Sequence, residues 1–304
     1  MQANTQVPFM RQPQRHPGEV PFYIFCVTLN LSLAAFALFL SEQIKGLLGQ
    51  SLGSVLVSLV GDSIWAVLGV IPLIVVAREL MRARVRANAI LLSREQYPDI
   101  YALMENFAVR MGLMQRFSLR KWKRLELYLQ NGNGTLNAFA AQASGKGYVT
   151  LFSELFSDLY ANDRDGLAFI LGHELAHIRL WHTNLLYLLS VCYVAGLPMI
   201  GTTLSRLREM SCDNFGATLS PRGVNGLLLL TAGRHNYRYV NLPAFLQRAP
   251  EQRSWFVWLV QFATASHPFM VYRIPRLFKL GLFEPPSGGS PLAGVPPTPQ
   301  PVAP

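Results

Sequence analysis

One five-residue stretch constrains this chain more than any other. Residues 173–177 read His-Glu-Leu-Ala-His, the H-E-x-x-H pattern that places two histidines four positions apart. On an α-helix such residues lie on nearly the same face, about 5.4 Å apart along the axis, so His173 and His177 can present two ring nitrogens to one metal ion. Glu174 then lies beside the metal without binding it, which suits a general base acting on a metal-activated water. The pattern therefore predicts a helix with part of a hydrolytic zinc site, against the alternative of a solvated polar helix turn.

A pair of acidic residues further along the chain supplies a candidate for the third metal ligand. A catalytic zinc requires a third protein ligand and an open position for water. Residues 204–213 have helical character and carry Glu209 and Asp213 four positions apart, so both share one face. Glu209 can bind the metal, and Asp213 can accept a hydrogen bond from the outer nitrogen of a ligating imidazole and fix its tautomer. Two acids on a helix are more often simply solvated, but this spacing beside an H-E-x-x-H stretch favours ligation of one zinc per chain.

Four segments together resemble the integral-membrane zinc metallopeptidases of the HtpX type, which are related to the CAAX prenyl proteases. In chain order they are Asn137-Ala138-Phe139-Ala140, then residues 173–177, then Ser205-Arg206 with Glu209 and Asp213, and finally Ser266-His267-Pro268 with Arg273-Ile274. The likeness extends from Arg78 to Leu280. It implies that His173, His177 and Glu209 bind zinc and that Glu174 is the general base.

The resemblance also implies roles that spacing alone does not indicate. His267 would stabilise the oxyanion, and the strand at Asn137, Ala138 and Phe139 would line the substrate cleft together with Arg273. Relatives of this type typically have two further membrane spans between the second histidine and the third ligand. This chain departs from that pattern, because only the 31 residues 178–208 separate the two positions.

The composition points to a membrane. Of 304 residues, 51% are hydrophobic and only 14% are charged, and the mean hydropathy is +0.24, which is unusual for a soluble protein. Residues 22–40 carry no charge and approach the roughly 20 residues that a helix needs to cross a bilayer. Residues 52–77 form a second apolar stretch that contains Asp62. We therefore expect an N-terminal transmembrane hairpin, with a cleaved signal peptide as the alternative for the first stretch.

The charge distribution predicts orientation and partners. The net charge is +10, from 27 Lys and Arg against 17 Asp and Glu, and the basic residues lie beside apolar runs, which fits anionic lipid headgroups better than nucleic acid. Arginines follow the second stretch, whereas the loop between the stretches has one acid and one base. The positive-inside rule then places the catalytic domain on the cytoplasmic side, most simply of a bacterial inner membrane. These arginines are Arg78, Arg82, Arg84, Arg86 and Arg94. The three cysteines have no metal or redox spacing and imply no disulfide framework.

The chain divides into four expected parts. They are a disordered tail (1–21), the transmembrane hairpin (22–77), a peptidase domain (78–283) with an apolar insert (185–204), and a Pro- and Gly-rich disordered tail (284–304). One crossing by the insert would separate Glu209 from His177 by a bilayer, and two crossings need about 40 residues. We therefore expect the insert not to span. Gly196, Pro198 and Gly201 would break it into a short helical pair that dips into the membrane or packs on the first two spans.

Strand signals occur between residues 125 and 152. Leu125, Leu127 and Leu129 alternate with polar residues, and strand-like runs at 136–141 and 148–152 are separated by Asn- and Gly-rich turns. The prediction is a mainly α fold with a small antiparallel β-sheet, an α+β catalytic domain of the zincin type, in a multi-pass membrane protein. An exposed edge strand could hold an extended peptide by backbone pairing, with a purely structural hairpin as the alternative.

The sequence thus predicts a membrane-anchored zinc endopeptidase that hydrolyses membrane or misfolded proteins. Its expected partners are protein or peptide substrates and the lipid bilayer, not nucleic acid, and a homo-oligomer is allowed. One alternative is a protease for prenylated C-terminal peptides; another, of a different class, is a non-catalytic scaffold or sensor stabilised by zinc. Glu174 favours an enzyme, because a structural site needs no base. His182 and His235 have no matching ligand partner and are interpreted as surface or structural residues.

Overall fold

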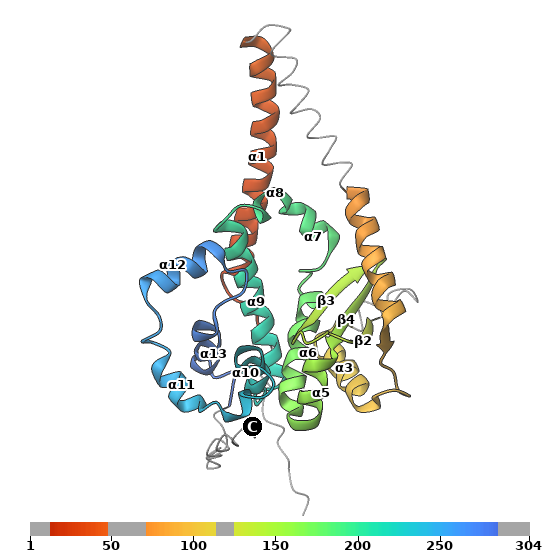
Figure 1. The fold of residues 1–304 in the computed structure, drawn as a ribbon. Coiled ribbons are helices and arrows are strands. Elements are labelled where there is room, and N and C mark those ends of the chain that lie inside the picture. The colour runs from red at the N-terminus through yellow and green to blue at the C-terminus, as the bar shows by residue number, and fades with distance from the viewer. Residues whose placement is uncertain (1–12, 48–70, 114–124, 285–304) are drawn as a thin grey trace, which may run out of the picture.

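The computed structural model describes residues 13–47, 71–113 and 125–284, and they form a mainly helical molecule with a small sheet (Figure 1). Of the expected disordered tails at 1–21 and 284–304, residues 1–12 and 285–304 lie outside these residues, as does most of the second expected span, including Asp62. The described end of the first tail already enters a helix at Glu19. The part of that span from residue 71 onward is helical and continues to residue 88.

The elements in chain order are α1 (Glu19–Leu47), β1 (Ala89–Leu91), α3 (Pro98–Arg110), β2 (Leu125–Gln130), β3 (Ala138–Ala143), β4 (Lys146–Phe152), α5 (Ser153–Asn162), α6 (Arg164–Arg179), α7 (Leu185–Ser190), α8 (Cys192–Ala195), α9 (Ile200–Leu219), α10 (Val224–Ala232), a 3₁₀ turn (Tyr237–Tyr239), α11 (Leu242–Arg248), α12 (Trp255–Thr264) and α13 (Met270–Lys279).

The sheet is mixed, so the expectation of an antiparallel sheet was wrong. Its strand order is β1-β2-β4-β3. β3 and β4 form an antiparallel hairpin, whereas β2 and β4 run parallel. β4 is the most buried strand, with five consecutive buried residues. Such continuous burial is typical of a strand inside a sheet, and β4 lies between β2 and β3. The loop after β2 does not close a hairpin, since β2 pairs with β1 and β4 and not with β3. The Glu154 carboxylate at the start of α5 accepts hydrogen bonds from the backbone N–H groups of Gly132 and Gly134 in this loop.

Helix α6 is the centre of the domain and packs against α9, α3, α5, α10 and the sheet (Figure 1). Asp163 caps its N-terminus by accepting a 2.7 Å hydrogen bond from the Gly166 N–H. The helix is buried almost throughout because its glycines allow other helices to approach closely. A methyl carbon added to Gly172 would lie 3.2 Å from the Cα of Gly216 in α9, and one added to Gly216 would lie 2.9 Å from the carbonyl oxygen of Phe169.

Helix α6 ends in a tight turn that reverses the direction of the chain. Trp181 adopts a left-handed conformation with φ of 72°. The His182 N–H then bonds to the carbonyl of His177 at 3.0 Å, and the Trp181 N–H bonds to that of Ile178 at 3.3 Å. These two bonds define a Schellman motif, with a tryptophan where glycine is usual. The turn brings His182 back beside the last turn of the helix.

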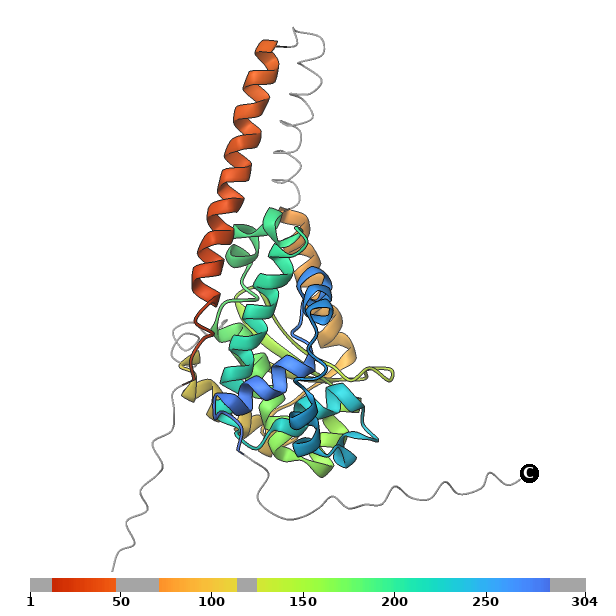
Figure 2. The same ribbon diagram turned by 90° about the vertical axis from the view of Figure 1, so that its left-hand side faces the viewer.

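Helix α1 extends away from the other described elements as a long rod (Figure 2). Its window Glu19–Phe36 is long and apolar enough to cross a membrane, and only 17% of that window is buried. It is the one such helix among the described residues. This finding is compatible with a membrane anchor or a signal sequence near the N-terminus, and it does not establish a multi-pass protein.

The apolar insert forms two short helices, α7 and α8, before α9 begins at Ile200. Tyr187, Val191 and Val194 pack with Cys26 at the base of α1 in a small hydrophobic cluster. The insert therefore lies against the first expected span.

Candidate metal centre

Three donor side chains from α6 and α9, His173, His177 and Glu209, converge on one point. His173 Nε2 lies 3.3 Å from His177 Nε2, His173 Nε2 lies 3.3 Å from Glu209 Oε2, and His177 Nε2 lies 3.4 Å from Glu209 Oε1. Metal–ligand bonds of about 2.0–2.2 Å at tetrahedral angles separate ligand atoms by about 3.4 Å. The two imidazoles and one carboxylate therefore fit a tetrahedral zinc in both chemistry and spacing.

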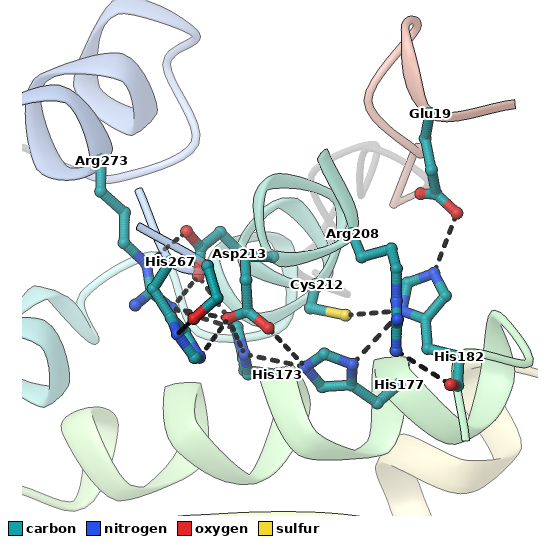
Figure 3. A network of polar contacts seen from close by, with 11 residues as sticks. Glu19, His173, His177, His182, Arg208, Cys212, Asp213, His267 and Arg273 are labelled. Carbon is teal, nitrogen blue, oxygen red and sulfur yellow. Dashed lines mark hydrogen bonds and ion pairs between the residues drawn. The ribbon is translucent and has the colours of Figure 1, made fainter. Parts of the chain in front are cut away.

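The second acid of α9 lies behind the first imidazole. His173 Nδ1 lies 2.9 Å from Asp213 Oδ1, as expected for a ring N–H that donates to the carboxylate. Arg273 donates two further hydrogen bonds of 2.6 Å to Asp213, one to each oxygen. All three side chains are buried (Figure 3). Asp213 thus fixes the ring of His173 with Nε2 toward the cluster, and Arg273 compensates the charge of Asp213.

The electrostatics of this cluster favour a cation. Burial disfavours charge on His173, but hydrogen bonds with Asp213 and Glu209 outweigh it and raise the pKa of His173 to about 10. Burial likewise opposes ionisation of Glu209, yet the hydrogen bonds with His173 and His177 hold the pKa of Glu209 well below its usual range. The Glu209 carboxylate is therefore ionised near neutral pH. Since Arg273 compensates the charge of Asp213, the charge of Glu209 is balanced either by a proton on His173 or by a metal ion.

A pocket of about 290 Å³ opens onto the cluster. It is lined by Asn137, Ala138, Phe139, Ala140, Leu155, Ile170, His173, Glu174, His177, Thr183, Arg208, Glu209, Leu230, His267 and Arg273. All the cleft residues that the sequence indicated are among them. β3 forms one wall and is the edge strand of the sheet, paired with β4 on one side only within the described part of the chain. One cavity is therefore lined by the metal donors, by Glu174 and by the unpaired edge of β3.

His267 lies at the rim of this pocket, in the loop between α12 and α13. Its Nε2 is 3.6 Å from Glu209 Oε2, and its ring is largely exposed. The loop is held by Arg206 of α9, which donates hydrogen bonds of 2.6 Å and 2.7 Å to the carbonyls of Gln261 and Ala265. Arg206 thereby ties the end of α12, and with it the loop that carries His267, to α9.

Comparison with known proteins agrees with this geometry. Residues 98–201 match the model described as peptidase family M48. The chain carries an M48 peptidase domain. The matched domain is that of a metalloendopeptidase family whose members are zinc-dependent, and the match includes His173, Glu174 and His177. No match was found among curated proteins or among solved structures.

The M48 domain also contains donor atoms that the sequence did not indicate. His182 was interpreted as a surface or structural residue, but it is buried, and its Nδ1 lies 3.3 Å from His177 Nδ1. Its Nε2 lies 2.9 Å from Glu19 Oε1 of α1. Cys212 Sγ lies 3.5 Å from His182 Nδ1. Burial raises the pKa of the Cys212 thiol well above its usual value, so this sulfur remains protonated. The H-x-x-x-x-H spacing of His177 and His182 was the only signal for this contact.

Replacing Asp213 by asparagine should weaken zinc affinity by about 10- to 100-fold, the usual cost of losing a carboxylate that orients a ligating histidine. Competition with a chromophoric chelator measures this constant. Unchanged affinity would mean that Asp213 serves only the packing of α9 and α13.

Proposed function

We propose that this M48 domain is an endopeptidase that holds one Zn²⁺ with His173, His177 and Glu209 and uses Glu174 as its general base. The observation that carries the proposal is the convergence of these three donor groups, whose nearest nitrogen and oxygen atoms lie 3.3 to 3.4 Å apart, on a pocket that Glu174 also lines. A structural zinc site is closed by four protein ligands, whereas three ligands leave a position open.

Each side chain has a defined task in this mechanism. A bound Zn²⁺ supplies Lewis acidity, which lowers the pKa of a coordinated water toward about 7 and polarises a carbonyl oxygen. Glu174 accepts the proton of the attacking water and later delivers it to the leaving amine nitrogen. His267, at the rim, donates a hydrogen bond to the oxygen that becomes negative, a contribution that can reach roughly 3 kcal/mol.

The proposed substrates are extended segments of membrane or misfolded proteins. An edge strand binds a peptide through backbone N–H and carbonyl groups, which every sequence offers. β3 is such an edge, and Ala138 and Phe139 line the pocket that holds Glu174. Recognition through the backbone accounts for a broad choice of sequences.

The test is cleavage of casein, an unfolded protein, by the purified full chain. We expect cleavage that a chelator abolishes and stoichiometric zinc restores. Cleavage that persists after the metal has been removed and verified absent would contradict a zinc mechanism.

We further propose that α1 anchors the domain in the cell membrane with the zinc site in the cytoplasm. Large apolar side chains such as Ile24, Leu31 and Phe36 are exposed along α1, where lipid would cover them.

The side of the membrane on which the domain lies can be measured with the variant Asn236→Cys. Asn236 is exposed and far from α1 along the chain. The background replaces Cys26, Cys192 and Cys212. A membrane-impermeant thiol reagent should label this cysteine only after the cells are opened. Labelling of intact spheroplasts would place the domain outside.

A further inference from the structure

A chain of buried polar contacts links the second zinc-binding histidine to helix α1. His177 Nδ1 lies 3.3 Å from His182 Nδ1, and His182 Nε2 lies 2.9 Å from Glu19 Oε1. The side chains of His182 and Glu19 are 0% and 1% exposed, so water does not replace these contacts (Figure 3). The three residues come from α6, from the turn after it and from the first turn of α1.

The carboxylate of Glu19 determines where the protons lie along this series of contacts. An ionised carboxylate only accepts hydrogen bonds, so the ring nitrogen of His182 that faces Glu19 carries a proton. The other nitrogen of a neutral His182 then holds a lone pair, which faces His177 Nδ1. His177 Nδ1–H donates a hydrogen bond to it. The lone pair of His177 Nε2 then remains free to bind a metal ion at the cluster. The same His182 nitrogen also lies 3.5 Å from the Cys212 sulfur, which is a second and weaker donor to that lone pair.

We propose that Glu19, acting through His182, is a positioning residue for the zinc ligand His177. This inference rests on the proposed zinc site. Ligating histidines usually donate their second N–H to a carboxylate or carbonyl, which fixes the ring and increases its basicity. His173 has Asp213 in direct contact at 2.9 Å. His177 has Glu19 at the far side of one intervening imidazole.

Glu19 is itself held in place by the segment that precedes α1. Arg15 donates a 3.0 Å hydrogen bond to Glu19 and a second one, of 3.2 Å, to the carbonyl of Leu180 at the end of α6. The His16 N–H donates to Ser211 Oγ of α9 at 2.8 Å. The segment at the start of α1 is thus held against both helices that carry the proposed zinc ligands, so its docking would strengthen metal binding.

A second metal ion is the competing interpretation of the same atoms. His177, His182 and Cys212 offer ligand atoms within 4.8 Å of one another. A neutral imidazole has one lone pair on nitrogen, however, so His177 could serve two metals only after losing both ring protons. Glu19 also occupies the other nitrogen of His182, and Cys212 is a buried thiol. Hydrogen bonding explains all of these contacts without an additional ion.

The decisive variant is Glu19→Gln, which preserves the shape of the side chain and removes its charge. We expect zinc affinity, measured by competition with a chelator, to fall by about 10- to 100-fold. We also expect the visible spectrum of the Co²⁺-substituted protein to change, because the orientation of a ligand ring changes. Glu126→Gln is the matched control, since Glu126 forms a 3.0 Å ion pair with Arg82 at the sheet, outside the metal cluster. Circular dichroism of the metal-free proteins verifies that both variants fold.

A double-mutant cycle tests the route through His182. If Glu19 acts through this ring, Glu19→Gln should add no further loss of affinity in a His182→Ala background. Additive losses, or unchanged zinc affinity and Co²⁺ spectrum in folded Glu19→Gln, would overturn the inference. So would two zinc ions per chain that decrease to one in Cys212→Ser.

The zinc site itself is tested separately. If wild-type protein bound no zinc, or if Glu209→Ala bound it as tightly as wild type, the proposed function would fail. Tight zinc binding that depends on Glu209 but not on Glu19 would remove only the positioning role.

Discussion

The Glu174→Gln variant should bind about one zinc per chain and yet cleave casein at least ~10²-fold more slowly than the wild type, because general base catalysis typically contributes 10²- to 10⁴-fold. The amide has the same shape as the carboxylate but cannot accept the proton of the attacking water. His173, His177 and Glu209 remain, so the metal stays bound. Turnover is measured at saturating substrate, and zinc content by elemental analysis of the same preparation.

Two comparisons make this result specific to Glu174. Glu154→Gln, which alters a carboxylate at the start of α5 that binds Gly132 and Gly134, should retain most activity if the preparation is sound. A Glu174→Gln protein with near wild-type turnover would exclude Glu174 as the base. One that has lost its zinc would instead assign Glu174 to metal binding.

The largest effect on the metal is expected from Glu209→Ala. This change removes a ligand outright and leaves two imidazoles whose nitrogens lie 3.3 Å apart, too few donors for a stable zinc site. Zinc affinity should fall well beyond the ~10- to 100-fold expected for loss of an outer partner such as Asp213. Cleavage should be lost with the metal and should return in part only at high zinc concentration.

Glu105→Ala serves as the matched control for this variant, since Glu105 of α3 forms a 3.1 Å ion pair with the exposed Arg94, away from the metal cluster. Its zinc titration should superimpose on that of the wild type. If Glu209→Ala retained tight zinc, another residue would be the third ligand, and the convergence of the three donor groups would be a coincidence of packing.

Those parts of the candidate site that lie on one helix could be predicted from the sequence. Residues four apart share a helix face, so the spacing alone places His173 beside His177, and Glu209 beside Asp213. The helical character of most of the chain was also predictable, and the structure is mainly helical.

Contacts between distant segments could not be predicted in this way. Glu19 and His182 are 163 positions apart, and they meet because a left-handed Trp181 reverses the chain, which no residue preference would suggest. The parallel pairing of β2 with β4 was missed for a related reason. Alternation identifies a strand and its buried face, but it does not specify which neighbour lies at each edge.

The close approach of α6 and α9 has a consequence for the choice of cation. Two donors lie on one helix and the third on the other, so the distance between the two backbones at Gly172 and Gly216 determines the span of the chelate. Metal–ligand distances in a good site vary by only about 0.2 Å, and a methyl group at either glycine would separate the helices by a comparable amount. Gly172 and Gly216 would therefore influence which cations fit between the donor groups without contacting the ion themselves.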